Sequence, residues 1–390
     1  MSRFNIAAAL LFCCFSLSAL GAGDESDGYV GITMDNSLSF SGKGSSIDLG
    51  GLGVWEVNAA ASAMAFSQTN PSTGAVDISN AQLLIQKSEG EYQFSMQTGL
   101  YTTPVLGKTI DRTLSNTVNT FGYIPLAAVS YVPNENWSIT AGKIPSMGGY
   151  ESNMTFQNLN IQRGLLWDQT SSVSYGGVVN YSKDEVSLAF TWNDGYYSNK
   201  MNWLGVSGSY QLSAKESAGL SWVGSTSPNS QNTPNTPLLQ NNSQIVNALY
   251  SFNGDRWYFA PYLQYTLVPA NQSIGITSEY KTYGAAILAN YRFSGADWLG
   301  LSGAKMSLPV RLEFIQERGG VANGANSMLF GPNSSATSFT ITPTIQVDKF
   351  FARVEGSLVQ LNNPEPGLAF GSNNMQHSQV RMMLEVGLLY

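Results

Sequence analysis

Residues 338–347 read SFTITPTIQV, and they alternate strictly between polar and apolar side chains. The even-numbered positions hold Ser, Thr and Gln, whereas the odd-numbered positions hold Phe, Ile, Pro and Val. Because successive side chains of a β-strand point to opposite faces, this stretch predicts a strand with one polar and one apolar face. The same alternation recurs at 92–100, 186–193 and 257–265. Few segments show a helical period, so the pattern favours an all-β protein.

The alternation extends from about residue 52 to the end of the chain and predicts sixteen strands, an even number. Turn residues fill the short connections, such as Lys183-Asp184, and much longer connections lie between them. The expected long loops are 103–120, 145–170, 226–241, 268–279, 318–335 and 362–377. The expected strands are 52–66, 77–87, 91–102, 121–132, 136–144, 171–182, 185–194, 202–212, 216–225, 242–252, 256–267, 280–293, 307–317, 336–347, 350–361 and 378–390.

Short turns on one rim and long loops on the other are typical of outer-membrane barrels. A β-sandwich would share the alternation, but it gives no reason for the ordered loop lengths. Strands of about 11 residues, tilted by about 45°, cover the roughly 25 Å of the lipid-facing band. We therefore predict a transmembrane antiparallel β-barrel of about 16 strands, with short periplasmic turns and long extracellular loops. The connection 294–306 is too long for its class, so the strand ends beside it are the least certain.

The first 22 residues differ from the rest of the chain. Arg3 precedes a mostly apolar run at 6–20, which ends in small residues before an acidic stretch. This order predicts a secretory signal peptide at 1–22; the alternative, a membrane anchor, would need about 20 apolar residues. Both cysteines, Cys13 and Cys14, lie inside it. Residues 23–51 form a polar N-terminal extension, periplasmic or lumenal, in which an extra strand at 29–41 remains an alternative, and 52–390 form the barrel.

The composition excludes several classes of function. Only 12% of the residues are charged and 12% are aromatic, and no later stretch approaches 18 apolar residues. Helical membrane spans are therefore not expected. Without Arg3, 18 basic and 26 acidic side chains leave a net charge of −8, which disfavours nucleic-acid binding. A soluble all-β binding protein remains the alternative to a membrane barrel.

Aromatic residues crowd the strand ends beside the short turns, where a barrel meets the lipid headgroups. The last strand, 378–390, alternates apolar residues and ends on an aromatic ring, which resembles the signal read by the barrel insertion machinery. The predicted membrane girdle comprises Tyr131, Trp137, Tyr181, Tyr210, Phe252, Trp257, Phe293 and Tyr390.

Charged residues gather on the polar faces of the last five strands. An arginine facing lipid at mid-depth would cost about 2–4 kcal/mol, so their register predicts that they point into the lumen. Two interpretations stay open: a transverse field that selects solutes, or cross-strand ion pairs that brace the wall. These predicted pore-lining residues are Arg292, Arg311, Glu313, Glu317, Arg353, Glu355, Arg381 and Glu385.

The longest connection, 145–170, carries Glu151, Arg163 and Asp168 among amide and aromatic side chains. A loop of this length in a compact domain usually has a function. We predict that it folds into the pore as a constriction; the alternative is a surface lid or an adhesive loop.

A family resemblance follows from the order of motifs around this loop. Gly142-Lys143-Ile144 precedes Glu151 and the stretch 160–167 (NIQRGLLW), and a two-strand hairpin then closes on 192–195 (WNDG). This order resembles the OmpL-like β-barrel porins of Gram-negative bacteria, over about 52–390. The resemblance implies a barrel in the outer membrane and porin-like transport. Lys143, Glu151, Asn160 and Arg163 match positions where that family tends to repeat its polar residues.

An enzyme is not expected, because the only histidine, His377, has no partner beyond Ser378 and no motif for a metal or cofactor is present. We predict a water-filled porin for passive diffusion of small polar or charged solutes. The alternative is an outer-membrane adhesin or receptor that acts through its surface loops. Expected partners are outer-membrane lipid and lipopolysaccharide, the insertion machinery and small hydrophilic solutes; a homotrimer is common for such barrels, but no segment here argues for one.

Overall fold

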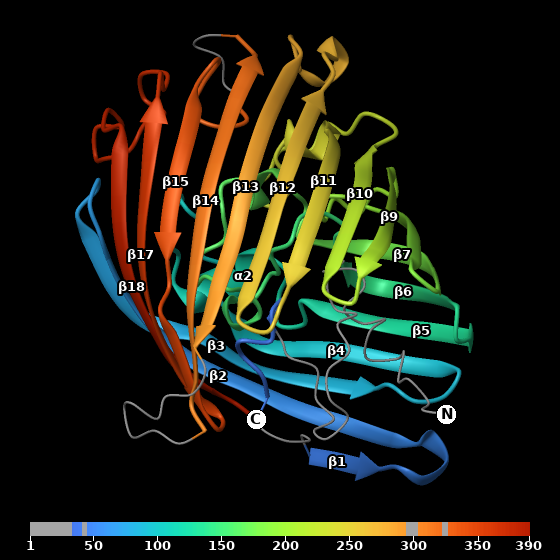
Figure 1. The fold of residues 1–390 in the computed structure, drawn as a ribbon. Helices are drawn as coiled ribbons and strands as arrows, with labels where there is room; N and C mark the ends of the chain where they lie inside the picture. The colour runs from blue at the N-terminus through green and yellow to red at the C-terminus, as the bar shows by residue number, and fades with distance from the viewer. Residues whose placement is uncertain (1–32, 41–44, 294–302, 322–326) are drawn as a thin grey trace.

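The computed structural model describes residues 33–40, 45–293, 303–321 and 327–390 (Figure 1). The predicted leader, 1–22, lies outside these residues. Almost every long element is a β-strand, and the strands stand side by side around a common axis (Figure 1). Within the described residues, no helix is long and apolar enough to cross a membrane.

Antiparallel strands form one closed sheet, because the last strand pairs with β2 at the start of the barrel, for example Leu384 with Ala65. β15 and β16 are two halves of one strand, since both pair with β14 and β17. β1 pairs with the first residues of β2, beyond the point where β18 ends. The strands are β1 Ser45–Asp48, β2 Val54–Gln68, β3 Thr73–Lys87, β4 Tyr92–Tyr101, β5 Leu126–Asn134, β6 Trp137–Pro145, β7 Val173–Lys183, β8 Val186–Asn193, β9 Trp203–Ser213, β10 Glu216–Ser225, β11 Gln244–Asn253, β12 Trp257–Val268, β13 Tyr280–Phe293, β14 Lys305–Gly319, β15 Ser335–Ile341, β16 Thr344–Val347, β17 Phe350–Asn362 and β18 Ser378–Leu389.

The barrel therefore has sixteen strands, and the predicted all-β antiparallel barrel is confirmed. The alternation also sorts the side chains as expected. On β8, Leu188 and Phe190 are exposed on the outer face, whereas Thr191 is buried on the inner face. On β15, Phe339 is exposed and Thr340 is buried. Period two places one set toward lipid and the other toward the lumen.

The largest error in the strand boundaries concerns β5, which begins at Leu126 rather than at 121. The preceding chain instead forms helix α2, Thr113–Asn119, which packs beside β4 and was not predicted. The strand predicted at 336–347 is interrupted after Ile341, because Pro343 has no N–H to donate to a ladder. In the described part of the chain, five short 3-10 helices lie in connections: Gly50–Leu52, Thr155–Gln157, Trp167–Gln169, Gln240–Asn242 and Gln272–Ile274.

The extra strand that was left open at 29–41 does not form over the described part of that range. Residues 33–38 make turns and bends instead, and the short strand of this region is β1, at 45–48. Most of the connection at 294–306 lies outside the described residues. The count of sixteen barrel strands is unaffected.

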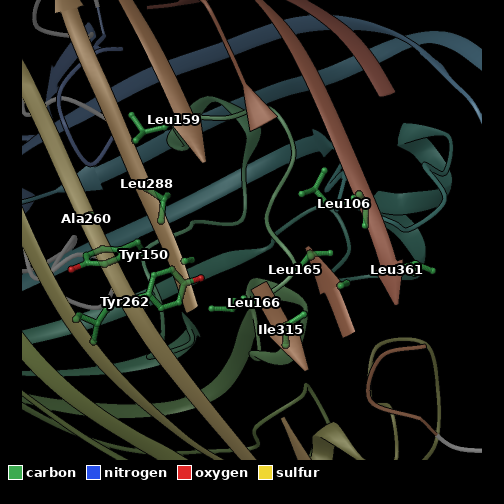
Figure 2. Packing of buried hydrophobic residues seen from close by; sticks show 14 of the residues in the cluster. Leu106, Tyr150, Leu159, Leu165, Leu166, Ala260, Tyr262, Leu288, Ile315 and Leu361 are labelled. Carbon is green, nitrogen blue, oxygen red and sulfur yellow. The ribbon is translucent and has the colours of Figure 1, made fainter. Parts of the chain in front are cut away.

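The connection between β6 and β7 passes into the barrel interior, where most of its residues are buried. Apolar side chains of this connection, including Tyr150, Leu165 and Leu166, pack on the inner faces of β12–β14, where Tyr262 and Ile315 lie (Figure 2). A polar-lined barrel thus contains an apolar core between its wall and one inserted loop.

Candidate functional site

The candidate functional site is built around residues 146–172, called here the lumen loop. Its two ends are adjacent, since Pro145 of β6 pairs with Val173 of β7 and Ser146 N–H donates to Ser172 O at 3.1 Å. Between these ends the chain passes into the barrel, and every residue from 158 to 166 is buried. The prediction that this connection enters the lumen agrees with that path.

Carboxylates on the opposite wall hold the lumen loop by its backbone. Glu355 accepts hydrogen bonds from the N–H groups of Ile161 and Gln162, at 2.5 and 3.1 Å. Glu313 accepts them from Leu165 and Leu166, at 3.0 and 3.2 Å. A buried N–H without a partner costs about 1–3 kcal/mol. These carboxylates accept hydrogen bonds from the loop's backbone N–H groups, as the carbonyl groups of a neighbouring strand do within a sheet.

Arginines on the same wall bind loop carbonyls. Arg353 donates to Asn158 O at 2.9 Å, and Arg311 donates to Gln162 O at 2.7 Å. Arg381 donates to Val105 O and Lys108 O, at 3.2 and 2.6 Å, and so holds the connection after β4 as well. We call the six wall residues the charged wall: Arg311, Glu313, Arg353, Glu355, Arg381 and Glu385, on β14, β17 and β18.

The charged wall is paired within itself and with the lumen loop. Arg353 lies 2.6 Å from Glu385, and Arg311 lies 2.5 Å from Glu151 of the lumen loop and 3.2 Å from Glu313. With Arg163, four buried arginines face four buried glutamates, none more than 5% exposed. These residues, predicted to line the pore, therefore lie behind the lumen loop and contact it rather than open water.

Glu151 occupies the centre of this network. Both of its carboxylate oxygens accept from Gly164 N–H, at 3.1 and 2.9 Å, and one also accepts from Arg311. Burial raises the pKa of the Glu151 carboxyl to about 6, against the opposing effect of the Arg311 charge. Glycine at residue 164 leaves room for the Glu313 carboxylate, because an added Cβ there would lie 2.1 Å from Glu313 Oε1.

Arg163 joins the lumen loop to the connection after β4. Its N–H donates to Pro104 O at 2.9 Å, its carbonyl accepts from Leu106 N–H at 3.0 Å, and its side chain donates to Ser152 O and Pro104 O. Burial lowers the pKa of the Arg163 guanidinium, which nevertheless stays protonated at neutral pH. The two connections thus form one inserted body.

The other charged residues singled out from the sequence lie apart from this network. Asp168 pairs with Lys108 at 3.1 Å and raises the pKa of that lysine. Glu317 accepts from the N–H groups of Met328 and Leu329 and so holds the connection after β14. Arg292 donates to Asp35 O at 2.5 Å. The importance of Asp35 was not predicted from the sequence.

The inner face of the described strands β4–β10 is uncharged. Along the described strands β4–β10, the inward positions carry Ser, Thr, Asn, Gln, Gly and apolar side chains, with no charged residue among them. Several hydroxyl residues of this face are partly exposed. They are Ser95, Ser130, Thr140, Ser187, Ser207 and Ser209. We call this face the neutral wall.

The predicted girdle residues lie at strand ends beside the short turns. Ring pairs form there, with centroids 4.8 Å apart for Trp137 and Tyr181 and 4.9 Å apart for Tyr291 and Phe293. Exposed side chains of the predicted set are Tyr131, Trp137, Tyr210, Trp257, Phe293 and Tyr390, while Tyr181 and Phe252 are half-buried.

Among the residues that the structure describes, no group of three His, Cys, Asp or Glu side chains is placed to hold a metal ion. The hydrogen bonds of the charged wall also go to the chain itself, which leaves it few free donors for a cofactor.

A sixteen-stranded antiparallel barrel with a polar interior and an inserted loop defines the class of outer-membrane porin folds. The chain belongs to the family described as "Putative beta-barrel porin-2, OmpL-like", whose model matches residues 49–390. The resemblance drawn from 142–195 is thereby confirmed. No curated protein matches the sequence.

Solved porin structures share the fold at very low identity. The anion-selective porin from Comamonas acidovorans is 10% identical, with a TM-score of 0.57 over 86% of this chain and 99% of that chain. The outer membrane channel DcaP of Acinetobacter baumannii is 10% identical, with a TM-score of 0.56 over 86% and 97%. Salmonella typhi OmpF, in complex with daunomycin, is 13% identical, with a TM-score of 0.53 over 86% and 98%. At such identity these likenesses establish the fold alone.

Proposed function

We propose that the chain is a porin of the Gram-negative outer membrane that lets small polar solutes diffuse passively and catalyses no reaction. The observation that carries the proposal is the lumen loop, held inside a sixteen-stranded barrel by the charged wall. A barrel of this size encloses an aqueous space unless something fills it. The lumen loop then sets the bore, and solutes pass along the neutral wall.

The charged wall acts on transport indirectly in this proposal. Its four glutamates and four arginines, counted with Glu151 and Arg163, neutralise one another beneath the loop. Their net field in the open lumen is therefore small, and ion selectivity is expected to be weak. Small hydrophilic solutes, lipopolysaccharide on the outer face, the insertion machinery at β18 and a homotrimeric assembly are the partners that this proposal includes.

Planar-bilayer recording tests the proposal directly. The purified full-length chain should give stepwise currents in symmetric salt, with a reversal potential near zero in a salt gradient. Liposomes that contain it should swell in small neutral sugars. A barrel that inserts, shown by its heat-modifiable gel mobility, but stays electrically silent would contradict the proposal and favour a receptor that acts through its surface loops.

A further inference from the structure

A second segment, from the N-terminal part of the chain, enters the barrel at the rim of the short turns. Residues 33–40, called here the N-terminal lumen segment, lie among the ends of β13, β14 and β16 that adjoin the short turns (Figure 1, dark blue). Ser39 N–H donates to Gln346 Oε1 at 3.0 Å, and Gln346 Nε2 donates back to Ser39 O at 2.6 Å. Lys305 Nζ donates to Ser39 Oγ at 2.8 Å. The segment is thus bonded to inward-facing side chains.

Asp35 both shapes this segment and fixes it to the wall. Its carboxylate, fully buried, accepts from Thr33 Oγ1 at 3.2 Å and from Ser37 N–H at 3.0 Å, which closes a turn. The same carboxylate accepts from the Asn290 amide and lies 3.8 Å from Arg292 Nη1. A buried carboxylate is stable only when paired and hydrogen-bonded, and all of these partners come from the turn and β13.

Apolar contacts join the segment to the lumen loop. Leu38 and Phe40, 1% and 7% exposed, belong to one cluster with Met154 and Phe156 of the lumen loop. Phe351 of β17 and Leu389 of β18 complete that cluster on the wall side. The N-terminal lumen segment therefore contacts the inserted body on the predicted periplasmic side of that body.

We propose that the N-terminal lumen segment is a tethered plug that narrows the periplasmic end of the channel and is latched there by Asp35. The inference rests on the proposed porin function. The described part of the segment forms no strand with the wall, so it can leave without breaking a ladder hydrogen bond of the barrel. Its attachment consists of side-chain bonds and of apolar contacts with two clusters, through Leu38 and Phe40 in one and Met34 in the other. Such contacts exchange with water at modest net cost.

The test combines a lock with a release variant. Because Cys13 and Cys14 lie in the predicted leader, Ser39→Cys and Gln346→Cys supply the thiols of the exported chain, and a short bis-maleimide should join them in high yield. Asp35→Arg places a second cation beside Arg292 and should raise single-channel conductance several-fold. Asp48→Arg, the same charge change on exposed β1, should leave conductance unchanged. When residues 39 and 346 are joined in the Asp35→Arg variant, conductance should stay at the wild-type level.

Failure can be assigned to one proposal or the other. Absence of the cross-link would show that the segment does not occupy the lumen and would overturn the plug. Equal conductance for Asp35→Arg, Asp48→Arg and wild type, with the cross-link formed, would also overturn it. Silence of all variants in the bilayer would overturn the porin function, while the cross-link would still report where the segment lies.

Discussion

Arg353 and Glu385 face each other directly across β17 and β18, and the arginine donates two hydrogen bonds to one carboxylate oxygen, from Nε at 3.0 Å and from Nη2 at 2.6 Å. The other oxygen of Glu385 accepts from Thr155 of the lumen loop at 2.7 Å. This pair joins the barrel wall to the inserted loop. It is a cross-strand ion pair of the kind that one of the two interpretations left open by the sequence expects, the bracing of the wall.

Removing one partner of this pair should destabilise the seated loop strongly. Glu385→Gln leaves the Arg353 charge buried without its counterion, and the expected cost is about 3–5 kcal/mol. Limited proteolysis should then cut the lumen loop, and thermal unfolding should begin earlier. Arg353→Met combined with Glu385→Gln should recover part of the loss. Arg318→Met, an exposed arginine at the end of β14, serves as the control; equal effects of both arginine changes would contradict the role of the pair.

Gly164→Ala should displace the lumen loop by steric conflict. The added Cβ would lie 2.1 Å from Glu313 Oε1 and 2.6 Å from its Cδ. Overpacking of this kind costs about 1–3 kcal/mol. Conductance should rise and the unfolding temperature should fall, whereas Gly51→Ala, with nothing within 4 Å, should change neither. Wild-type conductance in Gly164→Ala would show that the loop does not sit against Glu313.

The raised pKa of Glu151 predicts that acid seats the lumen loop more firmly. The carboxyl has a pKa of about 6 when the loop is in place and returns toward about 4.3 when it is exposed to water. Protons therefore bind preferentially to the seated state as the pH falls through 6 toward 4.5, and that state gains free energy. Events with a conductance above that of the seated state should become rarer over this range, and Glu151→Gln should remove the dependence. A channel that opens more often in acid would contradict the assignment.

The lipid-facing register makes a separate prediction for β12. Leu263 is 61% exposed at mid-strand, so Leu263→Arg should destabilise the barrel in lipid by about 2–4 kcal/mol. Leu212→Arg, on an equally outward position close to the turn after β9, should cost about 0–1 kcal/mol. Denaturant unfolding from vesicles measures both changes. Equal costs would place Leu263 away from the hydrocarbon.

Much of the barrel could be predicted because period two is a local signal. The sixteen strands, their faces and the inward register of Arg311 and Arg353 all follow from alternation. The start of β5 could not be predicted, since residues 113–119 are polar and Asn-rich and carry little helical pattern, yet form α2 against β4. The break in the strand predicted at 336–347 had one sign in the sequence, the backbone N–H that Pro343 lacks.

The arrangement inside the lumen depends on contacts that no local pattern encodes. Glu355 binds Ile161 from a distant point of the chain, and Glu313 binds Leu165. From sequence, such glutamates are indistinguishable from residues that face open water. The N-terminal lumen segment gave a weak signal, Leu38 and Phe40 within a polar, glycine-rich stretch, which becomes informative only once its partners on the wall are known.

Shortening the lumen loop tests the account most directly. Pro145 and Val173 are paired, so residues 148–170 can be replaced by an Asn-Gly turn without stretching β6 or β7. The control replaces 270–278, a mostly exposed connection between β12 and β13, in the same way. In planar bilayers, the first variant should conduct several-fold more than wild type and the second should match it. Unchanged conductance in a correctly folded 148–170 variant would contradict a loop that narrows the pore.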